Sequence, residues 1–416
     1  IKAGWVSKTA LDIATLPLNA RQLFKILTGN NLKVEDRFPT QDGFEGMPNS
    51  QASFLLLSRH NGNLKEGVVE LVDLTNFEVL HTWNPDIDYF NRSVSQEDFK
   101  YLDRDGNNQR RKLTHAKLTK DNGLVFTNGP LIKIDSCSKL VFQNTEDQFH
   151  HTIETDVDNN MWVPSVLYPY ALPAKMVGTE PFRFNDDAIV KMNQYGKILY
   201  EKSVSEIFIE NGLEYLLFSL GGRSGFNPDP LHLNDIQPVD SDGRYWNRGD
   251  VFLSLRHQSM VLLYRPSTNK IIWKSTGQYM HQHDIDILDD SRISVFNNNS
   301  KDFITKDTID GHNEVIIYDF EIDEYSQYLQ ESLIQHDVKT ITGGRSEILE
   351  NNDLFVEETN YGRTLYFNSD GSLRWSHINR ASNGNVYSVG FSRILYKSED
   401  VLTVRNFLSS KGSCDE

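Results

Sequence analysis

Three stretches of the sequence repeat one pattern: residues 193–203 read NQYGKILYEKS, residues 266–276 read PSTNKIIWKST, and residues 368–378 read NSDGSLRWSHI. In each stretch, a polar turn containing Gly or Asn is followed by a short strand-like segment that carries an aromatic residue. Gly and Asn favour such turns because they tolerate a positive φ. The pattern predicts that each stretch closes one unit of a repeated β-structure.

Units that end in this way recur along most of the chain. Six can be delimited, and they begin near residues 52, 115, 150, 231, 281 and 343. Four-stranded units of roughly 40–60 residues suit a β-propeller, which closes on itself and so hides its sheet edges. A tandem of β-sandwiches is the rival fold, but it does not predict unit ends this alike. We therefore predict an all-β fold, a six-bladed β-propeller.

The predicted propeller spans residues 46–410, and residues 387–406 are expected to add strands that close the ring. Residues 1–45 differ from the rest, because their apolar residues have helical spacing with a break at Pro17. We expect a short helical N-terminal segment there, leading into the domain or away from an anchor. Residues 411–416 are expected to form a C-terminal tail. The residues of the helical pattern are Leu11, Leu18, Phe24 and Leu27.

Composition excludes several classes of partner. The chain of 416 residues is 38% hydrophobic and 11% aromatic, enough for a sizeable core rich in strands. Its net charge of −16, with no basic stripe, argues against nucleic acid or an anionic membrane surface. No apolar run approaches the roughly 20 residues of a membrane span. Cys137 and Cys414 either pair in an oxidising compartment or remain unrelated thiols.

Histidines gather where the units begin. His115, His150, His151, His232 and His283 all lie at or near the start of a unit, although the chain has only 12 histidines. The innermost strand of each propeller blade runs along the central channel. Residues at the entry of these strands would therefore meet at one mouth of the channel, although they are far apart in sequence. The pattern predicts a site built from several histidines.

Four short motifs fall within these entries: FHHTIETD at residues 149–156, HLNDI at residues 232–236, SLRHQS at residues 254–259, and QHD at residues 282–284. Their order and context resemble the arylsulfotransferase family, whose members are PAPS-independent aryl sulfate sulfotransferases on a six-bladed propeller. The family pattern H-x-N-[SD]-I, followed by an S-x-R-[HN]-Q-S strand, is matched by the second and third motifs. Its Q-H-[DT] entry is matched by the fourth. The resemblance extends from about residue 150 to residue 375.

The resemblance implies a role for each matching residue. His283 would be the nucleophile that becomes transiently sulfated, and Arg256 would bind the sulfuryl group. His232 would hold or protonate a substrate oxygen. His151 would be the remaining channel histidine, with His150 as its competitor for that place. We also expect Asn234 and Arg345 among the substrate-binding residues, Arg345 either as a second cation near the channel mouth or as a contact between units, and we expect His115 to line the channel without chemistry.

The resemblance also implies a ping-pong transfer from an aryl sulfate donor to a phenolic acceptor, with no cofactor and no metal. We expect a periplasmic or extracellular protein, with an anchor upstream of Ile1 or a homo-oligomer both compatible with the sequence. Two departures stand out. Residues 241–250, SDGRYWNRGD, lengthen the hairpin between His232 and Arg256, and the N-terminal β-domain of some members is not evident.

The chemistry is reasonable without the resemblance. A neutral imidazole can act as a nucleophile near pH 7. A guanidinium offers a permanent charge and a planar fork of donors for sulfonate oxygens. A second histidine can protonate the departing phenoxide, which contributes roughly 10²–10⁴-fold in rate. No Gly-rich phosphate loop that would bind a nucleotide sulfate donor is evident.

Other interpretations of the same residues remain open. A non-catalytic propeller could bind a protein partner or an anionic glycan through the same channel, using the Pro- and Tyr-rich residues 162–178 as a contact face. A third hypothesis, a metal-dependent hydrolase, would use the converging histidines as ligands. The triplets that begin at Asn91 and Asn298 fit the glycosylation acceptor pattern, which also arises by chance.

Overall fold

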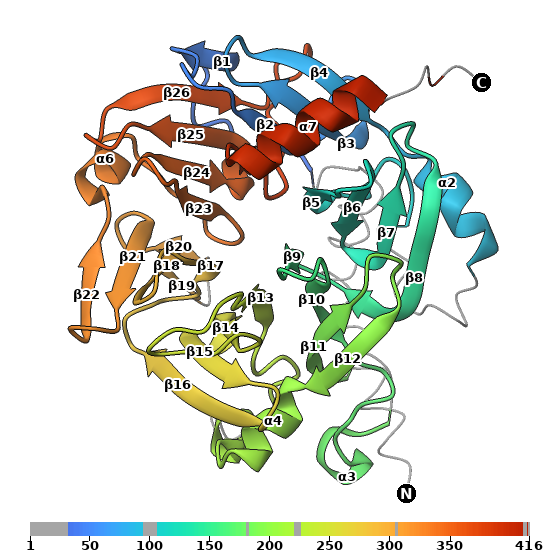
Figure 1. Ribbon diagram of the computed structural model, residues 1–416, viewed down its shortest axis with the longest axis vertical. Coiled ribbons are helices and arrows are strands. Elements are labelled where there is room, and N and C mark those ends of the chain that lie inside the picture. The colour runs from blue at the N-terminus through green and yellow to red at the C-terminus, as the bar shows by residue number, and fades with distance from the viewer. Residues whose placement is uncertain are drawn as a thin grey trace, which may run out of the picture.

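Antiparallel sheets stand around a central axis like the blades of a propeller (Figure 1). The computed structural model describes residues 32–94, 106–179, 183–219, 226–303 and 307–410, together with Cys414. This arrangement confirms the predicted all-β propeller. The strands nearest the axis include β5, β9, β13, β17 and β23 (Figure 1), which are respectively Thr114–Leu118, Glu154–Thr155, Leu233–Pro238, His283–Ile287 and Arg345–Ile348.

Three of the sheets have four strands each. The first is ordered β13-β14-β15-β16, and the second β17-β18-β21-β22. The third is ordered β27-β2-β3-β4, so a strand from the C-terminal part of the chain lies inside strands from its beginning. The bounds not yet given are β14 Val251–Leu255, β15 Met260–Arg265, β16 Lys270–Thr276, β18 Arg292–Asn297, β21 Glu314–Asp319, β22 Glu324–Gln327, β27 Arg393–Leu395, β2 Phe54–Asn61, β3 Glu66–Asp73 and β4 Glu78–Trp83.

Two larger sheets and a small one complete the fold. A five-stranded sheet is ordered β1-β26-β25-β24-β23, and an eight-stranded sheet is ordered β12-β11-β10-β8-β7-β6-β5, with β9 paired to β10. A two-stranded sheet pairs β19 with β20. Their remaining bounds are β1 Gly43–Gly46, β6 Leu124–Thr127, β7 Gly129–Ile134, β8 Leu140–Phe149, β10 Met161–Val166, β11 Asp187–Met192, β12 Ile198–Ser203, β19 Ser300–Lys301, β20 Thr308–Ile309, β24 Leu354–Glu358, β25 Arg363–Phe367 and β26 Leu373–Ile378.

Burial along the strands explains the sequence pattern. The middle strand β14, VFLSL, is buried at every position, because neighbouring sheets cover both of its faces. The outer strand β16, KIIWKST, alternates between exposed and half-buried residues. A strand packed on both faces has a continuous apolar run, whereas a half-buried strand alternates with a period of two. Two of the three turn-plus-aromatic stretches therefore form outer strands, β12 and β16, whereas the third forms β26, which β1 covers.

The C-terminal segment closes the ring with one short strand. The strand β27 pairs with β2 from Phe54↔Leu395 to Leu56↔Arg393, so part of the predicted closing segment is a strand. The prediction of further strands there was wrong, because α7 follows at Ser398–Ser410. This helix packs Val404 and Phe407 on the β2–β4 sheet and crosses over it (Figure 1).

The other helices are short and lie in connections. They are α2 Ile87–Phe90, α3 Ala174–Val177, α4 Val204–Glu210, α5 Glu214–Phe218 and α6 Gln330–Gln335. Three single 3₁₀ turns are η1 Asn91–Ser93, η2 Arg256–Gln258 and η3 Thr359–Tyr361. The turns η2 and η3 each join the second and third strands of a sheet. No helix among the described residues is long and apolar enough to cross a membrane.

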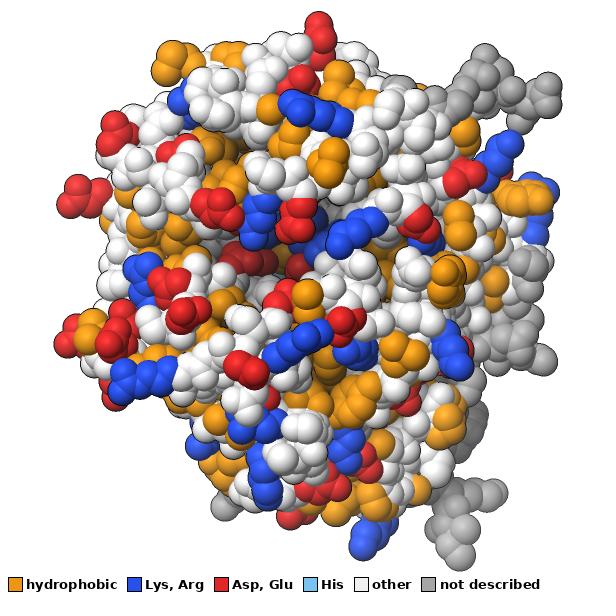
Figure 2. Space-filling model, viewed as in Figure 1, with side chains coloured by type: hydrophobic (Ala, Val, Ile, Leu, Met, Phe, Trp, Pro, Cys, Tyr) orange, Lys and Arg blue, Asp and Glu red, His pale blue; other side chains and the backbone are white. Residues whose placement is uncertain are grey.

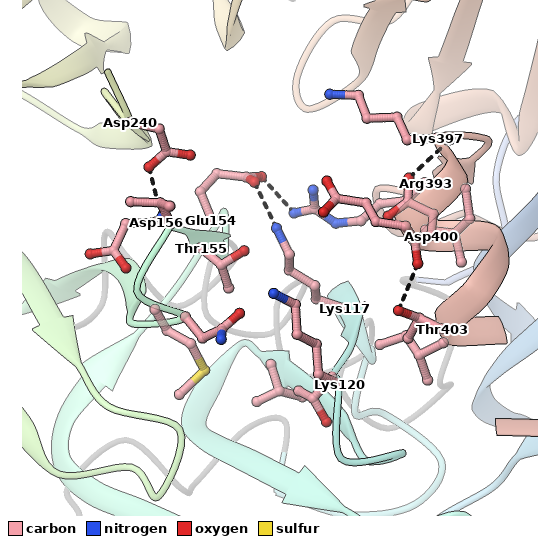
Figure 3. A pocket seen from close by; sticks show the side chains of 18 of the residues that line it. Lys117, Lys120, Glu154, Thr155, Asp156, Asp240, Arg393, Lys397, Asp400 and Thr403 are labelled. Carbon is pink, nitrogen blue, oxygen red and sulfur yellow. Dashed lines mark hydrogen bonds and ion pairs between the residues drawn. The ribbon is translucent and has the colours of Figure 1, made fainter. Parts of the chain in front are cut away.

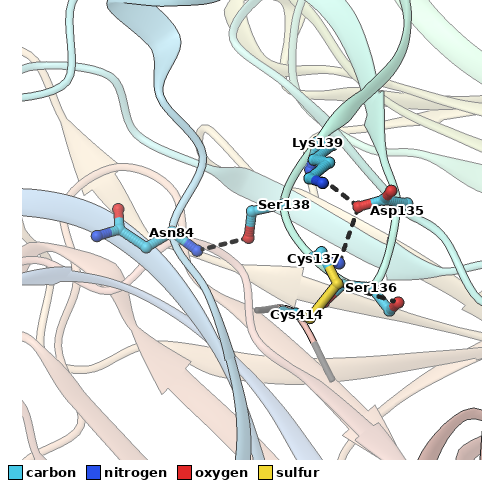
Figure 4. The surroundings of a disulfide bond; sticks show 7 residues. All are labelled: Asn84, Asp135, Ser136, Cys137, Ser138, Lys139 and Cys414. Carbon is cyan, nitrogen blue, oxygen red and sulfur yellow. Dashed lines mark hydrogen bonds between the residues drawn. A yellow bond between two sulfur atoms is a disulfide. The ribbon is translucent and has the colours of Figure 1, made fainter. Parts of the chain in front are cut away.

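The two ends of the chain are only partly described. The predicted N-terminal helices fall on residues 1–31, which lie outside the described residues. Residues 32–45 approach the ring, where Lys33 bridges Tyr387 and β1 pairs with β26. In the tail, Cys414 forms a disulfide with Cys137 in the turn between β7 and β8 (Figure 4). Asp135 holds that turn by accepting hydrogen bonds from the Cys137 and Lys139 backbone.

Candidate functional site

Seven histidines form one connected cluster where the inner strands begin. His151 lies at its centre, with ring centroids 4.9 Å from His150, 5.2 Å from His232, 6.0 Å from His115 and 6.1 Å from His283. Two further rings extend it, since His257 is 4.5 Å from His232 and 6.1 Å from His281. The structure thus brings together histidines that are up to 168 residues apart in sequence, counting from His115 to His283. The positions of these histidines at the starts of the units predicted that they would converge at a channel mouth.

Backbone strain accompanies this clustering. Four of the seven histidines have a positive φ: His115 at 56°, His151 at 57°, His232 at 55° and His281 at 54°. A residue other than glycine rarely adopts this conformation, and each instance costs on the order of 1–3 kcal/mol. Such residues concentrate at functional sites, where the surrounding structure holds them in place. The entry turns therefore place imidazoles at the channel mouth at a cost in stability.

His283 is fully enclosed and held by one partner. The residue is only 2% exposed, and its Nδ1 lies 2.6 Å from Oδ1 of Asn298. Burial, assisted by the charge of Arg256, lowers the pKa of His283 to about 3. The imidazole is therefore neutral across the physiological range, as a nitrogen nucleophile requires.

The partner also fixes which nitrogen carries the proton. The amide Nδ2 of Asn298 donates to the carbonyl oxygens of Thr340 and Gly343, at 2.9 and 2.7 Å, so its Oδ1 can only face His283 as an acceptor. The proton of neutral His283 must then be on Nδ1, which leaves a lone pair on Nε2. The Gly343 N–H donates to that lone pair at 3.3 Å, the long end of the hydrogen-bond range.

Asn298 begins a triplet that fits the glycosylation acceptor pattern. The structure contradicts that interpretation, because Asn298 is 0% exposed and its amide is used three times inside the protein. A glycan needs an exposed side chain.

A second histidine is paired with a carboxylate. Nδ1 of His232 lies 2.7 Å from Oδ2 of Asp229, three residues earlier. Although burial alone would raise it, the hydrogen bond from His232 lowers the pKa of the Asp229 carboxyl. Asp229 thus accepts the Nδ1–H of His232 and leaves Nε2 free to exchange a proton with a ligand. This is the arrangement by which carboxylates orient catalytic and ligating histidines.

Arg256 supplies a buried and unpaired cation. The sequence predicted that it lies in a strand, but β14 ends at Leu255 and Arg256 begins the turn η2. The residue is 8% exposed, and its guanidinium makes no hydrogen bond or ion pair with any residue in the described part of the chain. Burial lowers its pKa, an effect opposed by the charges of Asp302, Asp307 and Asp229. A buried guanidinium without a partner is costly, so its fork of donors is available to an anion.

His150 and His151 both belong to the cluster. Their Nδ1 atoms are 2.6 Å apart, so one ring donates a hydrogen bond to the other. Burial, followed by the neighbouring His150 and His232, lowers the pKa of His151 well below its usual value. His150 instead turns its Nε2 toward Asp187, at 3.6 Å. His151 is therefore the ring at the centre of the cluster, with His150 fixing its orientation.

The two remaining predicted residues make contacts within the protein. Asn234 is 1% exposed, and its Nδ2 donates to the carbonyl oxygen of Gln282 at 2.8 Å, directly before His283. Arg345 is 3% exposed, donates to Glu347 at 3.2 Å and to the Ser392 carbonyl at 3.3 Å, and has Asp284 at 3.6 Å. The Arg345 charge is thus balanced by carboxylates, unlike that of Arg256.

A cavity of about 510 Å³ lies toward the other end of the inner strands. It is lined by charges of both signs, several already paired: Glu154 accepts from Lys117 at 3.0 Å and pairs with Arg393 at 2.8 Å (Figure 3). Arg345 and Glu347 also line it. On this face, acidic and basic side chains surround the central hollow (Figure 2). The histidine cluster is formed by the opposite, N-terminal ends of the same strands.

Sequence reasoning missed three residues of the site. Asp229 orients His232, Asn298 orients His283, and His257 lies beside His232 with its Nδ1 donating to the Asp229 carbonyl oxygen at 2.7 Å. His257 was visible within the SLRHQS motif, next to Arg256. Asp229 and Asn298 carried no signal of their own, because their roles arise only from contacts in the fold.

Comparison with solved structures shows the fold alone. A protein of unknown function from Bacteroides caccae has 10% sequence identity and a TM-score of 0.50, with 83% of this chain and 99% of that chain covered. The WD40 domain of Neurospora crassa Pan2 has 10% identity and a TM-score of 0.44, with 84% and 94% covered. A streptogramin B lyase has 9% identity and a TM-score of 0.39, with 84% and 96% covered. The last two similarities are too low to support an argument.

Comparison with protein families is more specific. No curated protein sequence matches the chain. The family model described as arylsulfotransferase (ASST), however, matches residues 116–380, which is well over half of the chain and includes every histidine of the cluster except His115. With the propeller fold, this match supports an arylsulfotransferase-like function. The chain belongs to the arylsulfotransferase family.

Proposed function

We propose that this protein transfers a sulfuryl group from a phenolic sulfate ester to a phenol or another hydroxyl acceptor, through a sulfated intermediate of His283. The observation that carries the proposal is the tautomer of His283: a neutral, buried imidazole with its lone pair on Nε2, whose pKa is lowered by burial and by the charge of the unpaired Arg256 guanidinium. A nucleophile and an anion-binding cation in one buried cluster are what sulfuryl transfer requires.

The first half-reaction forms the intermediate. Nε2 of His283 attacks the sulfur of the aryl sulfate, so the N–S bond forms as the bond from sulfur to the phenolic oxygen breaks. The electron pair of that bond stays on the phenolic oxygen, which takes a proton from the imidazolium form of His232. Arg256 would hold the sulfonate oxygens, and the Gly343 N–H, released from Nε2, would become a further donor to them.

The second half-reaction returns the enzyme to its starting state. His232, now neutral, accepts the proton of the acceptor hydroxyl while the acceptor oxygen attacks sulfur and the N–S bond breaks. His283 leaves as a neutral imidazole, and the imidazolium of His232 is restored opposite the Asp229 carboxylate. No cofactor is consumed, because the proton released by the acceptor replaces the one given to the first phenol.

The number of blades belongs to the same proposal. We count six blades by dividing the eight-stranded sheet into β5–β8 and β9–β12. This division is supported by the weak link between its halves, since β8 and β10 share only the pairs Ser165↔Phe149 and Val166↔Gln148. The strand β9 pairs with β10 on the inner side, as β5 does with β6. Each half then has four strands, like the neighbouring sheets.

Steady-state kinetics with 4-nitrophenyl sulfate and phenol test the reaction. A ping-pong enzyme gives parallel lines in double-reciprocal plots at several phenol concentrations, and a burst of about one nitrophenolate per chain when phenol is omitted. Intersecting lines without a burst would contradict a covalent intermediate. Binding of phenyl sulfate without any turnover would favour the alternative of a non-catalytic binding propeller.

The pH profile of the first half-reaction provides another prediction. Because burial lowers the pKa of His283 to about 3, falling pH does not protonate the nucleophile between pH 8 and pH 5. Single-turnover release of nitrophenolate should therefore persist at pH 5, whereas an exposed histidine nucleophile would lose about tenfold or more over the same range. Stopped-flow absorbance measures this rate. A fall in this rate with an apparent pKa near 6.5, caused by protonation of His283 itself, would contradict the burial argument.

The leaving group separates the role of His232 from that of the nucleophile. His232→Ala should slow transfer from phenyl sulfate by roughly 10²–10⁴-fold, because the phenoxide then departs without a proton. The same variant should slow transfer from 4-nitrophenyl sulfate much less, since nitrophenolate leaves readily as an anion. Asp229→Asn should show the same preference with a smaller loss, because it only orients His232. Equal losses with both donors would contradict proton donation by His232.

A further inference from the structure

Two histidines converge on one carboxylate oxygen beside the proposed reaction centre. Nδ1 of His232 lies 2.7 Å from Oδ2 of Asp229, and Nδ1 of His257 lies 3.5 Å from the same oxygen. The three residues each offer a ligand atom within 4.8 Å of the others, the one such group among the described residues. Two imidazoles and one carboxylate are a ligand set that zinc uses in proteins, with water completing the coordination.

The distances suit a tetrahedral ion. With bonds of about 2.0–2.2 Å, neighbouring ligand atoms of tetrahedral zinc lie about 3.3 Å apart. The observed 2.7 and 3.5 Å lie on either side of that value, and all three ligand atoms lie within 4.8 Å of one another. All three side chains are partly exposed, at 29% for His232, 25% for His257 and 22% for Asp229. An ion can therefore reach the oxygen from solvent and keep a water ligand.

The backbone already holds the three residues together. The His257 N–H donates to the Leu231 carbonyl at 3.0 Å, and the Arg256 N–H donates to the His232 carbonyl at 3.0 Å. Gln258 adds a side-chain hydrogen bond to the Pro230 carbonyl at 2.6 Å. The segment 229–232 and the turn η2 are thus fixed relative to each other before any ion binds. A preorganised ligand set loses little conformational entropy on binding.

We propose that Asp229, His232 and His257 form a zinc site that inhibits sulfuryl transfer. Zinc would take the Nδ1 atoms of both histidines as neutral imidazoles: the imidazolium of His232 would release its Nδ1 proton to solvent, and neutral His257 would carry its proton on Nε2 instead of Nδ1. The hydrogen bond from His257 to the Asp229 carbonyl would be lost. Zinc would also break the contact by which Asp229 orients His232. The inhibition rests on the proposed function of His232, whereas the binding of zinc does not.

Isothermal titration of the full chain with zinc chloride tests the site itself. One equivalent should bind, and His257→Gln and Asp229→Asn should each weaken binding by at least about tenfold. His312→Gln is the matched control. His312, which lies away from the cluster, forms a similar pair with Asp337, with Nε2 and Oδ1 3.1 Å apart. The His312→Gln variant should bind zinc as the wild type does. Magnesium should not bind, since it requires oxygen ligands.

Independent measurements guard against misfolding. Circular dichroism checks each variant, and Co²⁺ added to the wild type should show the intense visible absorption of a tetrahedral site, which zinc then removes. Absence of a stoichiometric zinc equivalent would overturn the proposal. Equal affinity in His257→Gln, Asp229→Asn and the wild type would overturn it as well.

Activity provides the second readout. Zinc should slow nitrophenolate release by the wild type at least tenfold, and a chelator should restore it. His257→Gln should lose the sensitivity to zinc, measured as the ratio of its own rates with and without zinc. Zinc that binds without slowing release would overturn the inhibitory role. A wild type that binds zinc but releases no nitrophenolate even without it would refute the proposed function and leave the metal site intact.

Discussion

Replacing His283 with alanine is expected to reduce turnover of 4-nitrophenyl sulfate by at least about 10³-fold, to the limit of detection. The proposed intermediate is a bond to Nε2 of this residue. Asn298 holds Nδ1 of His283 and so fixes the position of Nε2, and we expect that no neighbouring imidazole can take over this position in the variant. His283→Asn should be equally inactive, because an amide nitrogen is not a nucleophile. Nitrophenolate absorbance in a continuous assay measures the loss.

The matched control removes another buried channel histidine. The ring of His115 lies 3.9 Å from that of Phe391 and 6.0 Å from that of His151, between ring centroids, but we assign it no chemistry. His115→Gln should therefore keep turnover within a few-fold of the wild type. If His283→Ala keeps more than about a tenth of the wild-type rate while remaining folded, His283 is not the nucleophile.

Arg256→Met should have the second-largest effect, with opposite consequences for activity and stability. Loss of the cation that holds the sulfonate should lower kcat/KM by roughly 10²–10³-fold. Arg256→Lys should recover part of that loss, because lysine restores the charge but not the planar fork of donors. The same Arg256→Met variant should raise the free energy of unfolding by about 1 kcal/mol, because it removes a buried charge without a partner in the described structure.

Urea unfolding and steady-state kinetics on the wild type, Arg256→Met and Arg256→Lys measure both effects. Arg345→Met is the contrasting variant, because Arg345 is also buried but is paired with Glu347 and Asp284. Breaking these pairs should destabilise the fold by about 3 kcal/mol or more. Arg256→Met that destabilises the protein to the same extent would mean that its guanidinium is structural.

Local chemistry made the repeated units and their histidines predictable. The closing strands of the units are recognisable in the sequence by their turn residues and aromatic residue. The entries of the inner strands are recognisable by their histidines and by the motif that contains Arg256. Ring closure was only partly predictable. The sequence suggests strands for residues 387–406, but only Arg393–Leu395 (β27) forms a strand there, whereas Ser398–Ser410 forms α7 because Val404 and Phe407 bury against the β2–β4 sheet. Tertiary packing decided that segment.

The supporting residues of the site could not be read from local patterns. Asn298 matched a glycosylation triplet, yet its amide is satisfied by two carbonyl oxygens and His283 from different turns. Asp229 became recognisable only when the fold placed it beside His232 and His257. Arg345 shares the entry position of the histidines, but the carboxylates around it are also a product of the fold. The proposed nucleophile His283 and the cation Arg256 are marked in the sequence, whereas the groups around them are not.

Mass spectrometry of the protein quenched during a single turnover tests the central claim most directly. After incubation with 4-nitrophenyl sulfate and no acceptor, the peptide containing His283 should carry one added sulfuryl group, which should be labile in acid and should disappear when phenol is added before the quench. Release of nitrophenolate with no adduct on His283, or with an adduct on another residue that phenol removes at the turnover rate, would contradict it.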